Sequence, residues 1–175
     1  MGKPKKRLIF AGDSLTEWFD WQARFPGYAI ENLGISGETV EGLLSRTGRI
    51  ITGFPAPDFL FLMTGINNIA MQDYGIISPY RELLRRCQQG WPSTHIVAQS
   101  VLPVLLEWIE QWRIPEINAG LKELCRGLDV SYLDVYRSFT DESGVPREDL
   151  LMDDGVHLST KGYEVWSAVV ENYIS

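Results

Sequence analysis

The chain has 175 residues, 45% of them hydrophobic and 22% charged, which predicts one folded domain over residues 1–175 and excludes a disordered or collagen-like chain. Its net charge of −7 excludes a protein that binds a nucleic-acid backbone through a concentrated basic surface. No stretch reaches the roughly 20 apolar residues of a membrane-spanning helix, so we expect no membrane span.

The N-terminal segment is basic, and we interpret residues 3–7 as a solvated tail. The apolar run that follows, Leu-Ile-Phe-Ala, is too short for a secretory signal, which needs about 7–15 apolar residues. Met1-Gly2 is not followed by the Ser or Thr at position six that N-myristoylation requires, because Lys6 stands there. These features favour a protein without a targeting segment.

The two cysteines, Cys87 and Cys125, form no C-x-x-C motif and fall within apolar patterns of helical spacing. We therefore expect reduced thiols in the core of a cytoplasmic protein. A secreted form made from a longer precursor remains an alternative.

Apolar runs alternate with amphipathic stretches along the chain, a pattern typical of an α/β fold with a parallel sheet. We expect strands at residues 7–11, 28–33, 59–64, 95–101 and 130–135. The run at 59–64, Phe-Leu-Phe-Leu-Met-Thr, is apolar almost throughout, as expected of a central strand covered on both faces.

The segments between the strands carry apolar residues at helical spacing. Ser78-Pro79 is a helix start signal, and Gly90-Trp91-Pro92 is a stop signal. The one-sided apolar positions are Val40, Leu43, Leu44 and Thr47, then Ile114, Ile117, Leu121, Leu124 and Leu128, then Tyr163, Trp166, Val169, Val170 and Tyr173. We predict a three-layer α/β/α sandwich with helices on both sides of a five-stranded parallel sheet.

Polar residues follow the ends of three expected strands. Ser14 follows the first strand, Gly37 the second and Asn67 the third. Ligands of open α/β sheets bind beyond the carboxyl ends of the strands, so these residues belong at one edge. His157 precedes the last helix, in a loop that can return to the same edge. The sequence therefore predicts a site there.

Ser14 is the candidate nucleophile, and a serine hydroxyl needs an adjacent base. His157 is the candidate base, because imidazole accepts and returns protons near neutral pH. A carboxylate that orients the imidazole completes such a site, and Asp154 and its neighbour Asp153 compete for this role.

A tetrahedral oxyanion also needs hydrogen-bond donors. The backbone N–H groups of Ser14 and Gly37 and the side-chain amide of Asn67 are the candidates. Taken singly, each motif is more often a turn, a helix cap or a surface residue. The ordered set at the ends of successive elements favours an ester hydrolase.

Other sites of this kind are less well supported. Ser36 lies in Gly-Ile-Ser-Gly-Glu, which lacks the final glycine of the G-x-S-x-G nucleophile elbow. His95, the only other histidine, opens a strand and is interpreted as a structural or surface residue. The sequence contains no G-x-G-x-x-G motif, no Walker A loop and no metal-ligand cluster, so we expect no cofactor and no metal.

These motifs resemble the blocks of the GDSL, or SGNH, hydrolase superfamily over residues 7 to about 170. The resemblance implies that Ser14 is the nucleophile, that Gly37 and Asn67 belong to the oxyanion hole, and that Asp154 and His157 form the D-x-x-H block. It favours Asp154 over Asp153 and implies a flavodoxin-like three-layer fold. Members of the superfamily hydrolyse carboxylic esters and thioesters without a cofactor.

The chain departs from the family pattern in two places. The third block has Asn68 where aspartate is commoner, a variant that resembles platelet-activating-factor acetylhydrolase-like members. The first block reads Gly-Asp-Ser-Leu-Thr, without the extension of some subgroups. Both departures concern subgroup and substrate, because the four name-giving residues are present.

The substrate is less well defined by the sequence. The short chain leaves little room for a lid, which favours small, short-acyl esters. Trp18, Phe19, Trp21 and Phe25 crowd the segment after Ser14 and either pack in the core or line an acyl pocket. Residues 102–112 are apolar and are expected to form a flap over the site or a contact in a homodimer.

Three functions follow from these observations. The leading one is a serine esterase for short acyl groups, such as acetyl, that acts on a small-molecule ester through an acyl-enzyme. The second is a lysophospholipase or thioesterase for longer chains. The third is a catalytically silent binding module.

Overall fold

The computed structural model describes residues 4–175. The interpretation of Met1-Gly2 and the position of Lys3 lie outside this range. Among residues 4–175, no helix is long and apolar enough to cross a membrane.

Five parallel strands form one sheet in the order β2-β1-β3-β4-β5. The strands are β1 (Arg7–Gly12), β2 (Ala29–Gly34), β3 (Phe59–Met63), β4 (His95–Gln99) and β5 (Ser131–Leu133). The expected strands and the α/β/α fold are confirmed, with ends that shift by one or two residues. β3 lies at the centre and is buried from Leu60 to Met63, which explains its apolar sequence.

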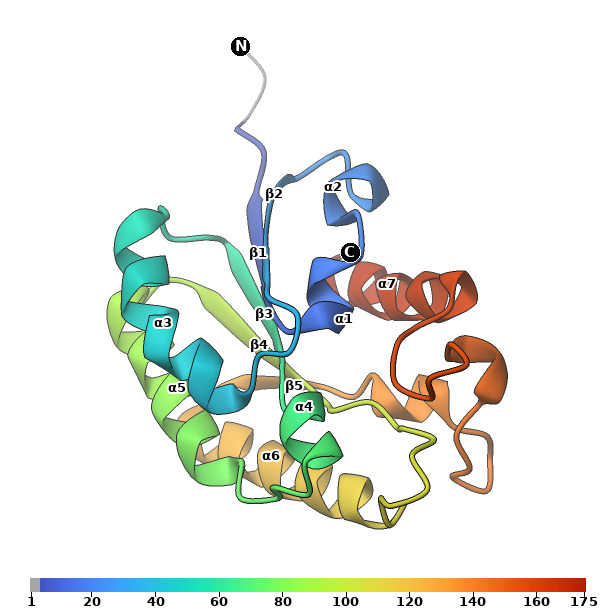
Figure 1. Ribbon diagram of the computed structural model, residues 1–175. Helices are drawn as coiled ribbons and strands as arrows, with labels where there is room; N and C mark the ends of the chain where they lie inside the picture. Colours follow the sequence, from blue (N-terminus) through green and yellow to red (C-terminus); the bar gives the residue numbers. More distant parts are fainter. Residues whose placement is uncertain (1–3) are drawn as a thin grey trace.

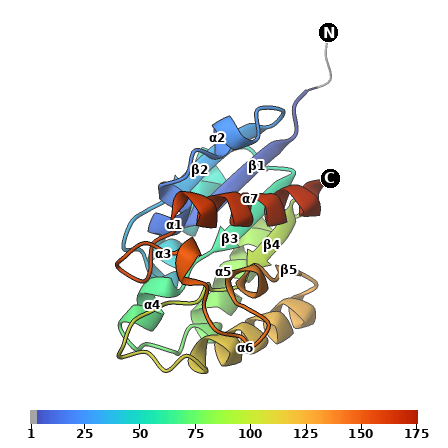
Figure 2. The same cartoon turned by 90° about the vertical axis from the view of Figure 1, so that its right-hand side faces the viewer.

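Helices cover both faces of the sheet (Figures 1 and 2). One face carries α3 (Val40–Gly53), α5 (Ile77–Gly90) and α6 (Arg113–Leu128). The other carries α1 (Ser14–Glu17), α2 (Trp21–Arg24) and α7 (Thr160–Ile174). Two 3₁₀ helices, Tyr136–Phe139 and Glu148–Leu150, precede the loop that leads into α7.

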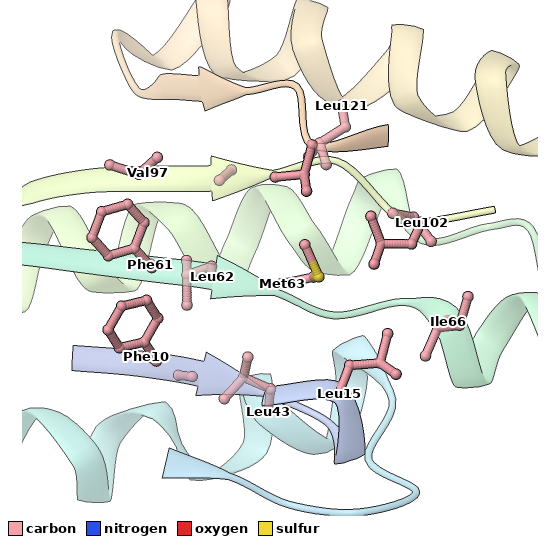
Figure 3. Close-up of a cluster of buried hydrophobic side chains, with 14 of the residues drawn as sticks. Phe10, Leu15, Leu43, Phe61, Leu62, Met63, Ile66, Val97, Leu102 and Leu121 are labelled. Carbon is pink, nitrogen blue, oxygen red and sulfur yellow. The ribbon is translucent and has the colours of Figure 1, made fainter. Parts of the chain in front are cut away.

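The core lies between the sheet and these helices, and Figure 3 shows the part near the carboxyl ends of the strands. Phe10 of β1 stacks on Trp21 at a centroid distance of 3.9 Å and on Phe61 of β3 at 5.0 Å. On the other face, Leu43 of α3 packs among the same cluster (Figure 3). These contacts hold the strands whose ends carry the candidate site.

Helix α5 begins earlier than its sequence signal predicts. It starts at Ile77 and its first turn closes on Ile76, whose carbonyl accepts from Tyr80 N at 3.0 Å. Ile76 is completely buried, so packing of this side chain favours the earlier start over the Ser78-Pro79 signal. Pro79 still lies in the first turn, where its missing N–H leaves no carbonyl unpaired.

Candidate active site

The strand register brings three of the predicted site residues together. Gly12 pairs with Gly34 of β2 on one side and with Met63 of β3 on the other. A Cβ on Gly12 would lie 1.9 Å from the Met63 carbonyl oxygen, so this close approach requires glycine. Ser14 and the loop that carries Gly37 therefore leave adjacent strands at the same edge.

Ser14 is the first residue of α1. Asp13 caps this short helix, and its Oδ1 accepts from Leu15 N at 3.1 Å. The Ser14 side chain is 4% exposed, and its Oγ lies 3.0 Å from His157 Nε2. The serine thus sits in a tight turn at the end of β1, with its hydroxyl directed at the histidine.

Asp154 holds His157 from the opposite side of the ring. Its Oδ2 lies 2.6 Å from His157 Nδ1, and its Oδ1 accepts from the backbone N–H groups of Val156 and His157, each at 2.9 Å. Partial burial opposes ionisation, but these hydrogen bonds keep the pKa of Asp154 below its usual value. An ionised Asp154 accepts a hydrogen bond from Nδ1–H, which leaves Nε2 free to accept one from the Ser14 hydroxyl.

The rival carboxylate, Asp153, is exposed, and within residues 4–175 the carboxylate in contact with the imidazole is that of Asp154. The chain after Asp154 forms a tight loop because the Asp154 side chain accepts from the N–H groups two and three residues further on. This local turn explains why the carboxylate three residues before the histidine reaches the ring.

The backbone N–H groups of Ser14 and Gly37 are the predicted oxyanion donors. Gly37 has a φ of 77°, in the left-handed region that favours glycine. Within residues 4–175, neither the Gly37 N–H nor the Ser14 N–H donates to a backbone carbonyl. Both groups are free to bind an oxyanion.

Asn67 lies on α4 (Ile66–Ala70), a short helix that the sequence pattern does not reveal. Its Nδ2 donates to the Glu38 carbonyl at 2.9 Å, one residue beyond Gly37. This bond ties the Asn67 amide to the loop after β2. One Nδ2 proton is used in the bond, and the other remains for a ligand.

The loop after β2 is braced by an ion pair. Arg46 of α3 donates from Nε and Nη2 to the two Glu38 carboxylate oxygens, both at 2.6 Å, and also from Nη2 to the Leu33 carbonyl at 2.7 Å. Both side chains are largely buried. A bidentate pair of this kind fixes geometry as well as charge, so it holds the Glu38 carbonyl that binds Asn67.

Asn68 stands where the superfamily that the motifs resemble commonly has aspartate. It is buried, and its side chain makes three hydrogen bonds. Its Oδ1 accepts from Val40 N at 3.0 Å, and its Nδ2 donates to Glu41 at 2.9 Å and to Asp73 at 3.0 Å. An amide suits this position because two of its partners are carboxylates. Asn68 thereby joins the start of α3 to α4.

Asp13 is fully buried, and burial raises its pKa to about 7, with the nearby Glu38 carboxylate acting in the same direction against the Leu15 hydrogen bond. Within residues 4–175, its Oδ2 and the buried hydroxyls of Thr16 and Thr64 have no hydrogen-bond partner. The native fold therefore favours the protonated form of the Asp13 carboxyl at pH values where an exposed carboxyl is ionised.

The aromatic residues after Ser14 divide between core and site. Trp21 and Phe25 are buried in the core, and Phe19 packs edge-on against Trp21. Trp18 is 53% exposed and stacks on His157, with ring centroids 4.1 Å apart and an angle of 11° between the rings. Sequence reasoning grouped the four together and did not identify this contact.

Residues 102–112 pass along the same edge. Leu105 N donates to the Gly155 carbonyl at 2.7 Å, and Trp108 Nε1 donates to the Ala70 carbonyl at 3.0 Å. The segment therefore connects α4, which carries Asn67, with the loop that carries Asp154 and His157. Trp108 and Trp112 remain exposed.

Within residues 4–175, the other candidate residues make no hydrogen bond to Ser14 or His157. Ser36 bonds to Glu17 and Trp18 rather than to a histidine. His95 lies at the amino end of β4, where its Nε2 is 2.7 Å from the Tyr173 hydroxyl. Both cysteines are free and buried, and burial raises the pKa of the Cys87 thiol to about 12. Among residues 4–175, no three His, Cys, Asp or Glu side chains are grouped to hold a metal ion.

A parallel α/β sandwich with hydrogen-bonded serine, histidine and aspartate at its carboxyl edge is an arrangement found in hydrolases. The model of the GDSL-like lipase/acylhydrolase family matches residues 10–165, and the chain belongs to this family. The family resemblance of the motifs is thus confirmed. A search of curated proteins finds no match.

Several solved structures share the fold. A candidate platelet activating factor from Streptococcus pneumonia is 24% identical, with a TM-score of 0.86 over 100% of this chain and 86% of that one. A lipase/acylhydrolase from Enterococcus faecalis is 22% identical, with a TM-score of 0.78 over 97% and 95%. A catalytic mutant of an acetylxylan esterase from Geobacillus stearothermophilus is 19% identical, with a TM-score of 0.78 over 98% and 95%. At these identities the likeness concerns the fold.

Proposed function

We propose that the protein is a serine ester hydrolase that cleaves short-chain acyl esters, such as acetyl esters, through an acyl-enzyme intermediate. The observation that carries this proposal is the hydrogen-bonded chain from Ser14 Oγ through His157 to Asp154, at 3.0 and 2.6 Å. Membership of the GDSL-like lipase/acylhydrolase family supports it independently.

In this mechanism Ser14 Oγ attacks the ester carbonyl carbon while His157 Nε2 takes the hydroxyl proton. Asp154 stabilises the imidazolium that forms and keeps the ring oriented. His157 then gives the proton to the departing alcohol as the acyl group remains on Ser14. A water molecule attacks the acyl-enzyme by the same steps in reverse, and the acid is released.

The negative charge of the tetrahedral intermediate falls on the former carbonyl oxygen. We assign its stabilisation to the N–H groups of Ser14 and Gly37 and to the free Nδ2 proton of Asn67. The loss of one such donor typically lowers the rate by about 10²–10³-fold. The mechanism requires no metal or organic cofactor.

The substrate we propose is a small-molecule ester. Exposed apolar side chains lie next to the elements that carry Asn67 and Asp154: Met71 follows α4, Trp108 bonds to Ala70, and Leu105 bonds to Gly155. They also favour a second candidate function, a lysophospholipase or thioesterase that acts on longer chains. A catalytically silent binding module is the remaining alternative, and the intact Ser14–His157 contact argues against it.

We further propose that residues 102–112 form a flap over the site, with a homodimer contact as the alternative. The double variant Trp108→Ala/Trp112→Ala changes chain-length preference if the segment is a flap. It changes the oligomeric state, measured by light scattering, if the segment is an interface. The proposal fails if both properties stay the same.

The two buried free thiols are typical of a reducing compartment and support a cytoplasmic location.

The test is a series of p-nitrophenyl esters from acetate to palmitate, with Ser14→Ala measured in parallel. We expect turnover of acetate or butyrate that is lost in the variant. An optimum at long chains favours the lysophospholipase or thioesterase. No turnover by the wild type, together with no labelling of Ser14 by a fluorophosphonate, supports the binding module and contradicts the enzyme.

A further inference from the structure

Trp18 contacts His157 in a way that the minimal mechanism does not use. Its indole lies almost parallel to the imidazole, with ring centroids 4.1 Å apart. The backbone fixes the position of Trp18, because its N–H donates to the Ser14 carbonyl at 3.0 Å. Trp18, which covers the face of the His157 ring, thus lies one helical turn after Ser14, which hydrogen-bonds to the edge of that ring.

The indole is itself held in place by two further residues. Trp18 Nε1 donates to Ser36 Oγ at 3.0 Å, and the Ser36 hydroxyl in turn donates to the Glu17 carboxylate. Ser36 N also donates to Glu17 Oε2 at 2.8 Å. Holding an exposed tryptophan in one orientation costs side-chain entropy, and these hydrogen bonds offset that cost. This chain of bonds restrains the indole plane.

Ser36 also connects two loops of the candidate site. Ser36 immediately precedes Gly37, one of the residues assigned above to the oxyanion site. The bonds from Ser36 to Glu17 and Trp18 therefore connect the loop after β2 to the α1 turn. Ser36 thus restrains both the Gly37 loop and, through Trp18, the ring of His157.

Stacking on an indole has an electrostatic effect as well as a steric one. The π face of tryptophan attracts a cation, and it is the strongest of the aromatic side chains in this respect. In the proposed mechanism His157 takes the Ser14 proton during acyl transfer and is then a cation. The indole therefore interacts more favourably with the transition state than with the resting enzyme.

We propose that Trp18 is a positioning residue that holds the His157 ring in its reactive plane and stabilises the imidazolium formed during the reaction. This inference rests on the proposed function. In this role Trp18 acts through His157, whose ring also hydrogen-bonds to Ser14 and Asp154.

The kinetic test compares Trp18→Leu, Trp18→Phe and Ser36→Ala with the wild type, using p-nitrophenyl acetate. Trp18→Leu removes the π face, and kcat is expected to fall about fivefold with KM unchanged. Trp18→Phe restores a π face and is expected to recover kcat to within about twofold of the wild type. Ser36→Ala keeps the indole but releases it from its hydrogen bond, and its kcat is expected to lie between those of Trp18→Leu and the wild type. Trp18 is half exposed, so these variants are expected to fold, and circular dichroism checks this.

An unchanged kcat in Trp18→Leu overturns the proposal. A raised KM with unchanged kcat also overturns it, because Trp18 would then bind substrate directly. Failure of Trp18→Phe to recover activity beyond Trp18→Leu contradicts the role of the π face.

A second measurement does not depend on ester turnover. The proton between His157 Nδ1 and Asp154 is expected to give a low-field NMR resonance, because the two atoms are 2.6 Å apart. We expect this resonance to broaden in Trp18→Leu and to persist in Trp18→Phe. Trp112→Leu is the matched control, since Trp112 is equally exposed and should leave the resonance unchanged.

A resonance of the same width in Trp18→Leu and wild type overturns the positioning role. If the wild type hydrolyses no ester, the proposed function fails while this comparison still decides whether Trp18 orders the ring. The two failures are therefore distinguishable.

Discussion

Replacing Asp13 with asparagine should remove a pH dependence of stability that the fold creates. Asp13 is buried beside Ser14, and burial raises its pKa to about 7 from a usual value of 3.8. The native carboxyl therefore keeps its proton up to about pH 7, whereas the unfolded chain loses it near pH 4. Between these values the native state binds more protons than the unfolded state, so the free energy of unfolding falls as pH rises.

The size of the effect follows from the two pKa values. Each pKa unit corresponds to about 1.4 kcal/mol, and most of the loss occurs between pH 4 and 7. From pH 5 to pH 8 this single group is expected to lower the free energy of unfolding by about 3 kcal/mol. An asparagine side chain at this position has the same shape as the aspartate, keeps an oxygen for the Leu15 N–H and does not titrate.

The assay is urea unfolding at pH 5 and pH 8, followed by far-UV circular dichroism. The stability of Asp13→Asn relative to the wild type should improve by about 3 kcal/mol between the two pH values. Asp20→Asn is the matched control, because Asp20 caps α2 from an exposed position. If wild type and Asp13→Asn lose the same free energy from pH 5 to pH 8, the buried carboxyl does not carry the pH dependence and the reasoning is refuted.

Two further substitutions test the polar contacts behind the site. Asn68→Asp places a third carboxylate beside Glu41 and Asp73, so unfolding at pH 7 should cost about 2 kcal/mol less than in the wild type, and the deficit should shrink at pH 5 as the carboxylates take up protons. An equal deficit at both pH values, measured by urea unfolding, would contradict the like-charge explanation. Arg46→Met leaves the Glu38 carboxylate buried and unpaired and should destabilise the protein by about 3 kcal/mol. Adding Glu38→Gln should recover most of that loss, and a double variant as unstable as the single one would argue against the buried charge as its cause.

Local sequence features predicted most of the fold. The strands β1, β3 and β4 are largely apolar runs, and such runs form parallel strands because both faces of the sheet are covered. The helix stop at Gly90 was also readable from the sequence, since α5 ends at this residue. Short elements were not predicted: α4 spans Ile66–Ala70 and is too short to show a helical period.

The chain order of the site residues and the strand pattern predicted that they meet at one edge. The structure adds which atoms meet: His157 Nδ1 contacts Asp154, and Trp18 covers the face of the ring. The Asp154 contact is local and follows the predicted D-x-x-H block, whereas the Trp18 contact is encoded in no local pattern, because Trp18 and His157 come from opposite ends of the chain. The roles of these residues in catalysis stay predictions.

The sequence by itself determined the class of fold, the family and the positions from which a catalytic serine, histidine and carboxylate would come, because strand pattern and short motifs depend on neighbouring residues. Only the tertiary structure decided the surroundings of those groups. Asp13 acquired its raised pKa through complete burial, and Asn68 acquired two carboxylate partners from α3 and the segment after α4. Burial and long-range contacts depend on how distant segments pack, which no local pattern specifies.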